Sequence, residues 1–88
     1  PIDENTLLAT ATELSELTRE VLLEPSQKRK HVRHRSGLAY ACRRYGHMSV
    51  SDISNLLSVS ESAVSKMIKR FRDRYPSLKK QWDRALNA

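Results

Sequence analysis

The sequence of 88 residues predicts an all-α protein, a compact bundle of about five or six helices. Apolar residues recur every three or four positions along most of the chain, which is the spacing of one face of a helix. Residues that cap helix N-termini precede several of these stretches, and no stretch alternates in the manner of a strand. Since a chain of this length has room for one hydrophobic core, we expect a single domain over residues 1–88.

Charge is segregated along the chain. Residues 1–24 carry six acidic residues and one arginine, a net charge of −5. The remaining residues carry 15 lysines and arginines and four acids, a net charge of +11. Cations that merely solvate helix surfaces are usually mixed with anions, so this separation favours phosphate as the partner.

The first 24 residues predict acidic N-terminal helices. Helical spacing over residues 3–17 places these residues on one face: Leu7, Leu8, Ala11, Leu14 and Leu17. Thr18 is the predicted N-cap of a short second helix, which should end near residue 24 because Pro25 disfavours a helical Glu24.

Residues 26–35 predict a basic loop that leads into a helix. The cationic and titratable residues of this segment are Lys28, Arg29, Lys30, His31, Arg33, His34 and Arg35. A long helix is expected at 34–46, with Leu38, Ala39, Ala41, Cys42 and Tyr45 at helical spacing. Arg43 and Arg44 complement the dipole at its end, and Gly46 is the expected C′ residue.

Residues 49–74 predict a helix-turn-helix. Ser49 and Ser60 are the expected N-caps of its two helices. Ile53, Leu57, Val59, Val64 and Met67 have the spacing of the small core that such a motif needs, with Ser54 as the small residue between the helices. Ser58 occupies the turn position that often holds glycine, which carries a conformational cost if its φ is positive.

A C-terminal helix is expected at 77–87, because Tyr75 and Pro76 end the preceding helix and Ser77 can cap a new one. Trp82 is expected to anchor it to the body of the protein.

The second helix of the motif supplies the candidate DNA-binding residues. Short polar and basic side chains near its N-terminus suit the edges of bases, namely Ser60, Glu61, Ser62, Ser65 and Lys66. Glu61 either accepts from a cytosine amino group or only favours the helix N-terminus electrostatically. Further contacts, mostly to phosphates, are expected from Lys69, Arg70, Arg29, Lys30, Arg33, Arg35 and Ser49.

Other kinds of site find little support. The three histidines and Cys42 lack paired ligand spacings, so we expect no metal, no cofactor and no catalytic residue. His31 and His34 are expected to add pH-dependent charge near phosphate.

Tyr40 and Tyr45 can stack on unpaired bases, although their spacing favours a core position for Tyr45. No apolar run approaches the roughly 20 residues that span a bilayer, so no membrane partner is expected. A lone cysteine excludes an internal disulfide and leaves the compartment open, with a reducing cytoplasm as the simpler interpretation.

Residues 32–53, VRHRSGLAYACRRYGHMSVSDI, resemble the start of the C-terminal DNA-binding domain of the bacterial replication initiator DnaA. That domain has a basic Arg-x-Arg loop, a long helix and a Trp-repressor-like helix-turn-helix. The resemblance implies that Arg33 and Arg35 are loop arginines that approach phosphates and the minor groove, and that residues 49–53 begin the helix-turn-helix.

Residues 35–72 also resemble a DnaA-like module found at the C-terminal end of some REP-associated, single-strand-type transposase-related proteins. These resemblances imply a bacterial, cytoplasmic and nucleoid-associated protein. The initiator's Gly-Gly-Arg-Asp-His signature is replaced here by residues 58–62, SVSES, so specificity for replication-origin boxes is not expected. The sequence also contains no nucleotide-binding P-loop.

We therefore expect sequence-directed binding of DNA, as a duplex or a hairpin, by a module of a larger DNA-processing or regulatory protein. One alternative is a protein-interaction or dimerisation domain, in which the acidic helix at 3–17 docks on the basic surface of a second copy. Another is recognition of structured RNA or of a DNA hairpin. The sequence leaves the target site and the oligomeric state open.

Overall fold

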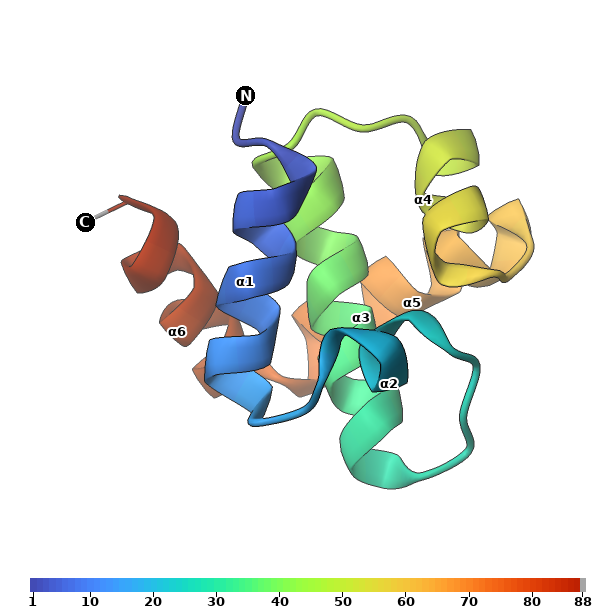
Figure 1. The fold of residues 1–88 in the computed structure, drawn as a ribbon, viewed down its shortest axis with the longest axis horizontal. Helices are drawn as coiled ribbons and strands as arrows, with labels where there is room; N and C mark the ends of the chain where they lie inside the picture. Colours follow the sequence, from blue (N-terminus) through green and yellow to red (C-terminus); the bar gives the residue numbers. More distant parts are fainter. Residues whose placement is uncertain (88) are drawn as a thin grey trace.

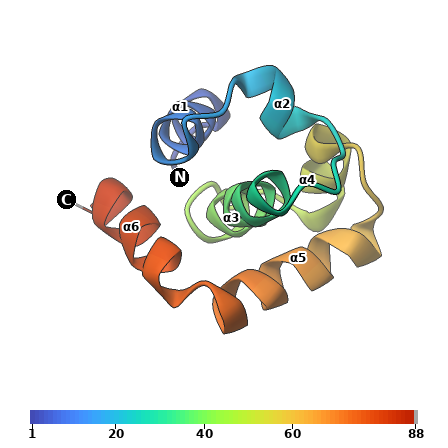
Figure 2. The same ribbon diagram turned by 90° about the horizontal axis from the view of Figure 1, so that it is seen from below.

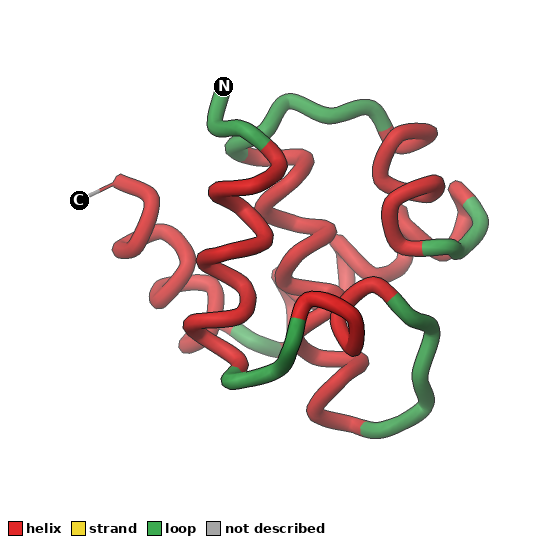
Figure 3. Tube along the Cα trace, in the orientation of Figure 1, coloured by secondary structure: helices red, strands yellow, loops and turns green. Residues whose placement is uncertain are grey.

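A computed structural model describes residues 1–87, and in that range the protein is all-helical with no strand. The six helices are α1 (Glu4–Ser15), α2 (Arg19–Leu23), α3 (Arg29–Arg44), α4 (Val50–Leu57), α5 (Glu61–Arg74) and α6 (Pro76–Asn87). Short loops join them (Figures 1 and 3). The predicted fold class, an all-α bundle of five or six helices, is confirmed.

Helix α3 is the centre of the fold and packs against each of the other helices. In Figure 2 it lies between α1 and α2 on one side and α5 on the other, while α6 covers a flank beside α1. Residues 34–42 of α3 are all buried, whichever side of the helix they are on. A helix that is covered on all sides belongs to the interior, so α3 fixes the positions of the helices around it.

Side-chain caps begin most of the helices. Thr18, Ser49 and Ser60 each accept a hydrogen bond from the backbone N–H three residues further on, at 3.2, 3.0 and 3.0 Å. These three predicted caps are confirmed. Ser77 is not a cap, since α6 already begins at Pro76. Proline suits this position because its fixed φ is helical and the N–H that it lacks would have no partner.

The predicted basic loop over residues 26–35 is wrong for most of its length, because α3 begins at Arg29. Lysine and arginine are good helix formers, so the basic run continues the helix backwards instead of interrupting it. The side chain of Ser26 organises this start: its Oγ accepts from the N–H of Lys28 at 3.2 Å and lies 3.0 Å from Nδ1 of His31.

Gly46 follows α3 as predicted, but it does not adopt the left-handed conformation of a C′ glycine; His47 has the positive φ, 53°. Glycine is needed at position 46 for space. A Cβ there would lie 2.8 Å from Cδ1 of Leu7 and 2.7 Å from the carbonyl oxygen of Cys42. The chain can therefore pass close to α1 only without a side chain at this point.

Gly37, in the middle of α3, has a similar role for α6. A Cβ at this position would lie 2.8 Å from Nε1 of Trp82 and 3.0 Å from a ring carbon of Phe71. The missing side chain leaves room for the indole, which is almost fully buried. Trp82 therefore anchors α6 to α3, as predicted from the sequence.

Arg35 is buried, with 3% of its surface exposed, and it connects three helices. Its Nη1 donates to the carbonyl oxygen of Leu22 at 2.8 Å, and its Nη2 donates to that of Leu57 at 2.7 Å. Both carbonyls belong to the last turn of a helix, α2 and α4 respectively, where no intrahelical N–H is available. The guanidinium therefore caps two helix C-termini from within a third helix.

We expect Arg35→Met to lower the free energy of unfolding by roughly 2–6 kcal/mol, because two buried carbonyls lose their donors at about 1–3 kcal/mol each. Arg35→Lys should lose less, since an ammonium can still reach one carbonyl. Urea unfolding followed by circular dichroism measures both. Arg29→Met, an exposed arginine of the same helix, is the matched control and should change stability by less than about 0.5 kcal/mol. Wild-type stability of Arg35→Met would contradict the capping role.

Candidate nucleic-acid interface

Helix α4, a three-residue turn and helix α5 lie within the span predicted for the helix-turn-helix. Ser58 has φ 57° and ψ 46°, so the turn does need a left-handed residue at this position. The N–H groups of Ser58 and Val59 both donate to the carbonyl oxygen of Ser54, which closes α4 tightly. The turn therefore retains the compact form that glycine would allow, with serine in a less favourable conformation.

The apolar residues predicted between α4 and α5 do form part of the core. Ile53, Leu57 and Val64 are fully buried, whereas Val59 and Met67 are half-buried. The inner face of α5 continues with Ile68 and Phe71 and packs on α3. Helix α5 lies across the bundle along one face (Figure 2), so its opposite side is left to solvent.

All the candidate residues of α5 lie on this solvent side: Ser60, Glu61, Ser62, Ser65, Lys66, Lys69 and Arg70. Three of the candidates already have partners within the protein. Oγ of Ser60 and Oγ of Ser49 act as helix caps, and Lys69 forms an ion pair with Asp73 at 2.7 Å, which lowers the pKa of that carboxyl. Lys66 and Arg70 form no ion pair within residues 1–87 and are the better donors.

The first turn of α3 lies beside the start of this surface. A cavity of about 180 Å³ is lined from one side by residues 25–27 and Val32, and from the other by Val59 and Met67. Lys28, Arg29 and Lys30 directly follow that loop and are exposed, while Arg33 is half-buried. We call these four residues the basic ridge. The fold thus brings the loop that precedes Lys28, Arg29 and Lys30 next to the α4–α5 turn, whereas Arg33 lies nearer the end of α5 and the start of α6.

A second group of cations, which we did not predict from the sequence, lies on the other flank of α5. Arg43, Arg44 and Arg72 surround a small cavity floored by Tyr40 and Ile68. The sequence did show Arg43 and Arg44 at the end of a helix, where a role at the helix dipole was sufficient to explain them. Their position beside Arg72 depends on how α5 crosses α3, which no local pattern specifies.

Two candidate residues are excluded from the surface. Arg35 cannot contact a phosphate, because its guanidinium is buried and donates to the carbonyl oxygens of Leu22 and Leu57. His34 is 7% exposed, and burial lowers its pKa to about 4, with further lowering by the charges of Arg33 and Lys30. It is therefore neutral near pH 7, and the prediction that it supplies pH-dependent charge is wrong.

The tyrosines are also committed to the fold. Tyr40 is buried and Tyr45 is half-buried, and both hydroxyls donate to Oδ1 of Asp83 on α6. Burial and the hydrogen bond to this carboxylate raise the pKa of Tyr45. Lys79 completes the cluster through an ion pair with Asp83 at 2.9 Å. These tyrosines join α3 to α6, and neither ring is free to stack on a base.

Acidic residues occupy the opposite side of the molecule. Helices α1 and α2 lie across α3 from α5 (Figure 2), and their exposed acids are Glu4, Glu13, Glu20 and the neighbouring Glu16 and Glu24. The charge separation of the sequence thus becomes a separation in space. The α5 side therefore carries mainly positive side chains and the α1–α2 side mainly negative ones.

Residues 1–87 contain no metal-binding cluster, no reactive thiol and no membrane-spanning helix. No group of three histidine, cysteine, aspartate or glutamate side chains is placed to hold a metal ion there. Cys42 is fully buried, and burial raises the pKa of its thiol to about 12, so it is not a nucleophile. None of the helices in this range has the length and apolar character that a bilayer crossing requires.

The chain matches no protein-family model, no curated protein and no solved structure.

The lowered pKa of His34 predicts a stability that depends on pH. Because the folded state keeps His34 neutral down to about pH 4 while the unfolded state takes up a proton near pH 6.5, stability falls as pH drops through this window. The contribution of His34 to this loss should be about 3 kcal/mol between pH 7 and pH 4. Urea unfolding of wild type and His34→Gln across this range isolates it. Parallel pH profiles for the two proteins would contradict the assignment.

Proposed function

We propose that the protein binds duplex DNA, with the exposed N-terminal half of α5 in the major groove and the basic ridge on the adjacent sugar-phosphate backbone. The proposal rests mainly on one observation. Short polar side chains and cations without anionic partners lie together on one face of the protein, and the acidic face is on the opposite side. An α-helix with its side chains is about as wide as the major groove of B-DNA.

The roles of the residues follow from their positions. Ser62, Ser65 and Lys66 lie in the first two turns of α5 and are proposed to meet base edges. Arg70 and Lys69 lie a turn further on and suit phosphates, although Lys69 must first leave Asp73.

The resemblance to the initiator's DNA-binding domain points to the same surface, with one exception. We keep the roles that it implies for Arg33 and residues 49–53 as part of the proposal, whereas Arg35 is left out because it is buried. A bacterial, nucleoid-associated module of a larger DNA-processing or regulatory protein fits this resemblance.

A dimerisation domain is the second candidate, because the acidic α1–α2 side and the basic α5 side are electrostatically complementary between copies. It is less well supported. No large hydrophobic side chain is exposed in residues 1–87, whereas stable dimers usually bury an apolar patch. Sedimentation that depends on protein concentration, with duplex binding no tighter than for any basic protein, would favour this alternative.

Binding to a duplex selected from a randomised library tests the proposal, by fluorescence anisotropy across a salt series. We expect the logarithm of affinity to fall with the logarithm of salt at a slope of about −5, because the four cations of the basic ridge, Lys69 and Arg70 are proposed to meet phosphates at about −0.9 each. Lys66→Ala should reduce discrimination against competitor duplex by about 1–3 kcal/mol. Lys30→Ala should weaken all duplexes alike and reduce the slope by about one unit.

Arg19→Ala is the matched control, because Arg19 is an exposed arginine of α2 on the acidic side. It should leave duplex affinity unchanged. If Lys66→Ala and Lys30→Ala both behave like this control, the proposed placement of DNA is wrong. A matched RNA or DNA hairpin that binds more tightly than the duplex would instead favour recognition of a structured nucleic acid.

A further inference from the structure

The proposed placement of DNA gives no role to one group of exposed cations. Arg43 and Arg44 end α3, and Arg72 lies in the last turn of α5. The three side chains line one small cavity of about 110 Å³, and none of the residues that line it is acidic. None of the three arginines forms an ion pair within residues 1–87. We call these three residues the arginine cluster.

The arginine cluster and the basic ridge lie on opposite flanks of α5. On the flank of the ridge, Met67 lines a cavity with the loop before the ridge, and Arg74 lines another with Arg33. Met67 and Arg74 are seven residues apart, or about two turns, and so share one side of the helix. Arg72 stands two residues before Arg74, which is about 160° away around the helix axis. Cations therefore border α5 on both sides.

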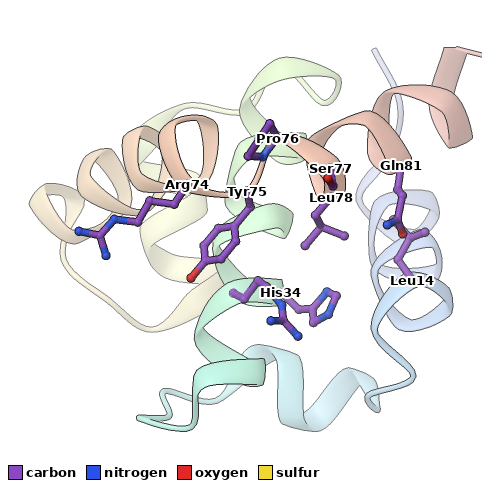
Figure 4. Close-up of a pocket in the computed structure, with 9 residues that line it drawn as sticks. Leu14, His34, Arg74, Tyr75, Pro76, Ser77, Leu78 and Gln81 are labelled. Carbon is purple, nitrogen blue, oxygen red and sulfur yellow. The ribbon is translucent and has the colours of Figure 1, made fainter.

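The charge of Arg74 is not enclosed between the helices. Its guanidinium is directed away from His34 and from the start of α6 (Figure 4), and the residue is exposed. The end of α5 thus presents one exposed arginine on each flank, Arg74 beside the ridge and Arg72 within the cluster.

Two arginines of the cluster are held in place by contacts that leave donors free. Nη1 of Arg43 donates to the carbonyl oxygen of Met48 at 2.9 Å. The guanidinium carbon of Arg44 lies 5.6 Å from the centre of the Tyr45 ring. Since a guanidinium has five N–H donors, each arginine keeps several for an outside acceptor. A side chain that already has a preferred position also loses less entropy when it binds.

The dimensions of duplex DNA place a phosphate strand along each flank of a helix in the major groove. The groove is about 12 Å wide, and a helix with its side chains is about 10–12 Å across. The two strands that border the groove therefore lie on either side of such a helix. Each strand carries one phosphate for about every 3.4 Å of the DNA axis, so separate arginines can meet separate phosphates and need not converge on one.

We infer that the arginine cluster binds phosphates of one strand of a DNA duplex while the basic ridge binds those of the other strand. The protein then contacts both borders of the major groove, and a single strand can occupy only one of the two positive flanks. The inference rests on the proposed function, because it requires α5 to lie in the groove.

Fluorescence anisotropy with the selected duplex across a salt series tests the cluster. The basic ridge, Lys69 and Arg70 account for a slope of about −5, and three further phosphate contacts would bring it to about −8. The double variant Arg44→Gln/Arg72→Gln should make the slope shallower by about two units. Arg44→Lys/Arg72→Lys should keep most of the slope, because lysine retains the charge. Arg19→Gln, an exposed arginine of α2, is the matched control and should leave the slope unchanged.

Duplexes in which neutral methylphosphonates replace the phosphates of one strand at a time identify the strands. Wild-type binding should weaken when either strand is neutralised. The double variant should lose sensitivity to one strand, and Lys30→Ala should lose part of its sensitivity to the other. If both variants lose sensitivity to the same strand, the inference is overturned.

The salt series also separates this inference from the proposed function. If the double variant keeps the wild-type slope while Lys30→Ala is shallower, the arginine cluster does not contact DNA and the proposed function stands. If the double variant and Lys30→Ala both behave like Arg19→Gln, the inference and the proposed placement of DNA are both wrong.

Discussion

The hydrogen bonds of Arg35 set the geometry on which the rest of the molecule depends. The guanidinium of Arg35 is buried in the protein with no carboxylate beside it. Two carbonyls at the ends of α2 and α4 stabilise it by accepting its hydrogen bonds. Leu57 directly precedes the turn that starts α5, so the position of that turn is tied to α3 through one side chain. The first turn of α3 carries the basic ridge, so the two parts of the proposed DNA surface keep a fixed relation to one another.

The two parts of helix α3 lie in different environments, although cationic residues occur in both. Its first residues are exposed cations, and its middle is buried on all sides, with glycine where Trp82 and Phe71 approach. This burial removes Arg35 and His34 from the surface, whereas the neighbouring Lys28, Arg29 and Lys30 are exposed and Arg33 is half-buried. The acids of α1 and α2 lie on the other side of α3, so the same helix also separates the two charged faces.

Local chemistry was enough to predict the caps and the apolar faces. Thr18, Ser49 and Ser60 cap helices because each can bond a backbone N–H three residues away, which needs no distant partner. Arg35 was misplaced because a basic run suggests surface, although it lies three, four and seven residues before Leu38, Ala39 and Cys42 and so belongs to their buried stripe. The cluster of Arg43, Arg44 and Arg72 could not be predicted, since it forms only where α5 crosses α3.

The most direct test of the account is to map a bound duplex on the backbone amide signals of the protein by NMR. We expect the largest shifts on adding DNA to fall on residues 59–70 and 28–33, with little change over α1 and α2. Shifts concentrated on the acidic helices, or spread evenly over the protein with no saturation, would contradict the claim that the α5 side is the nucleic-acid interface.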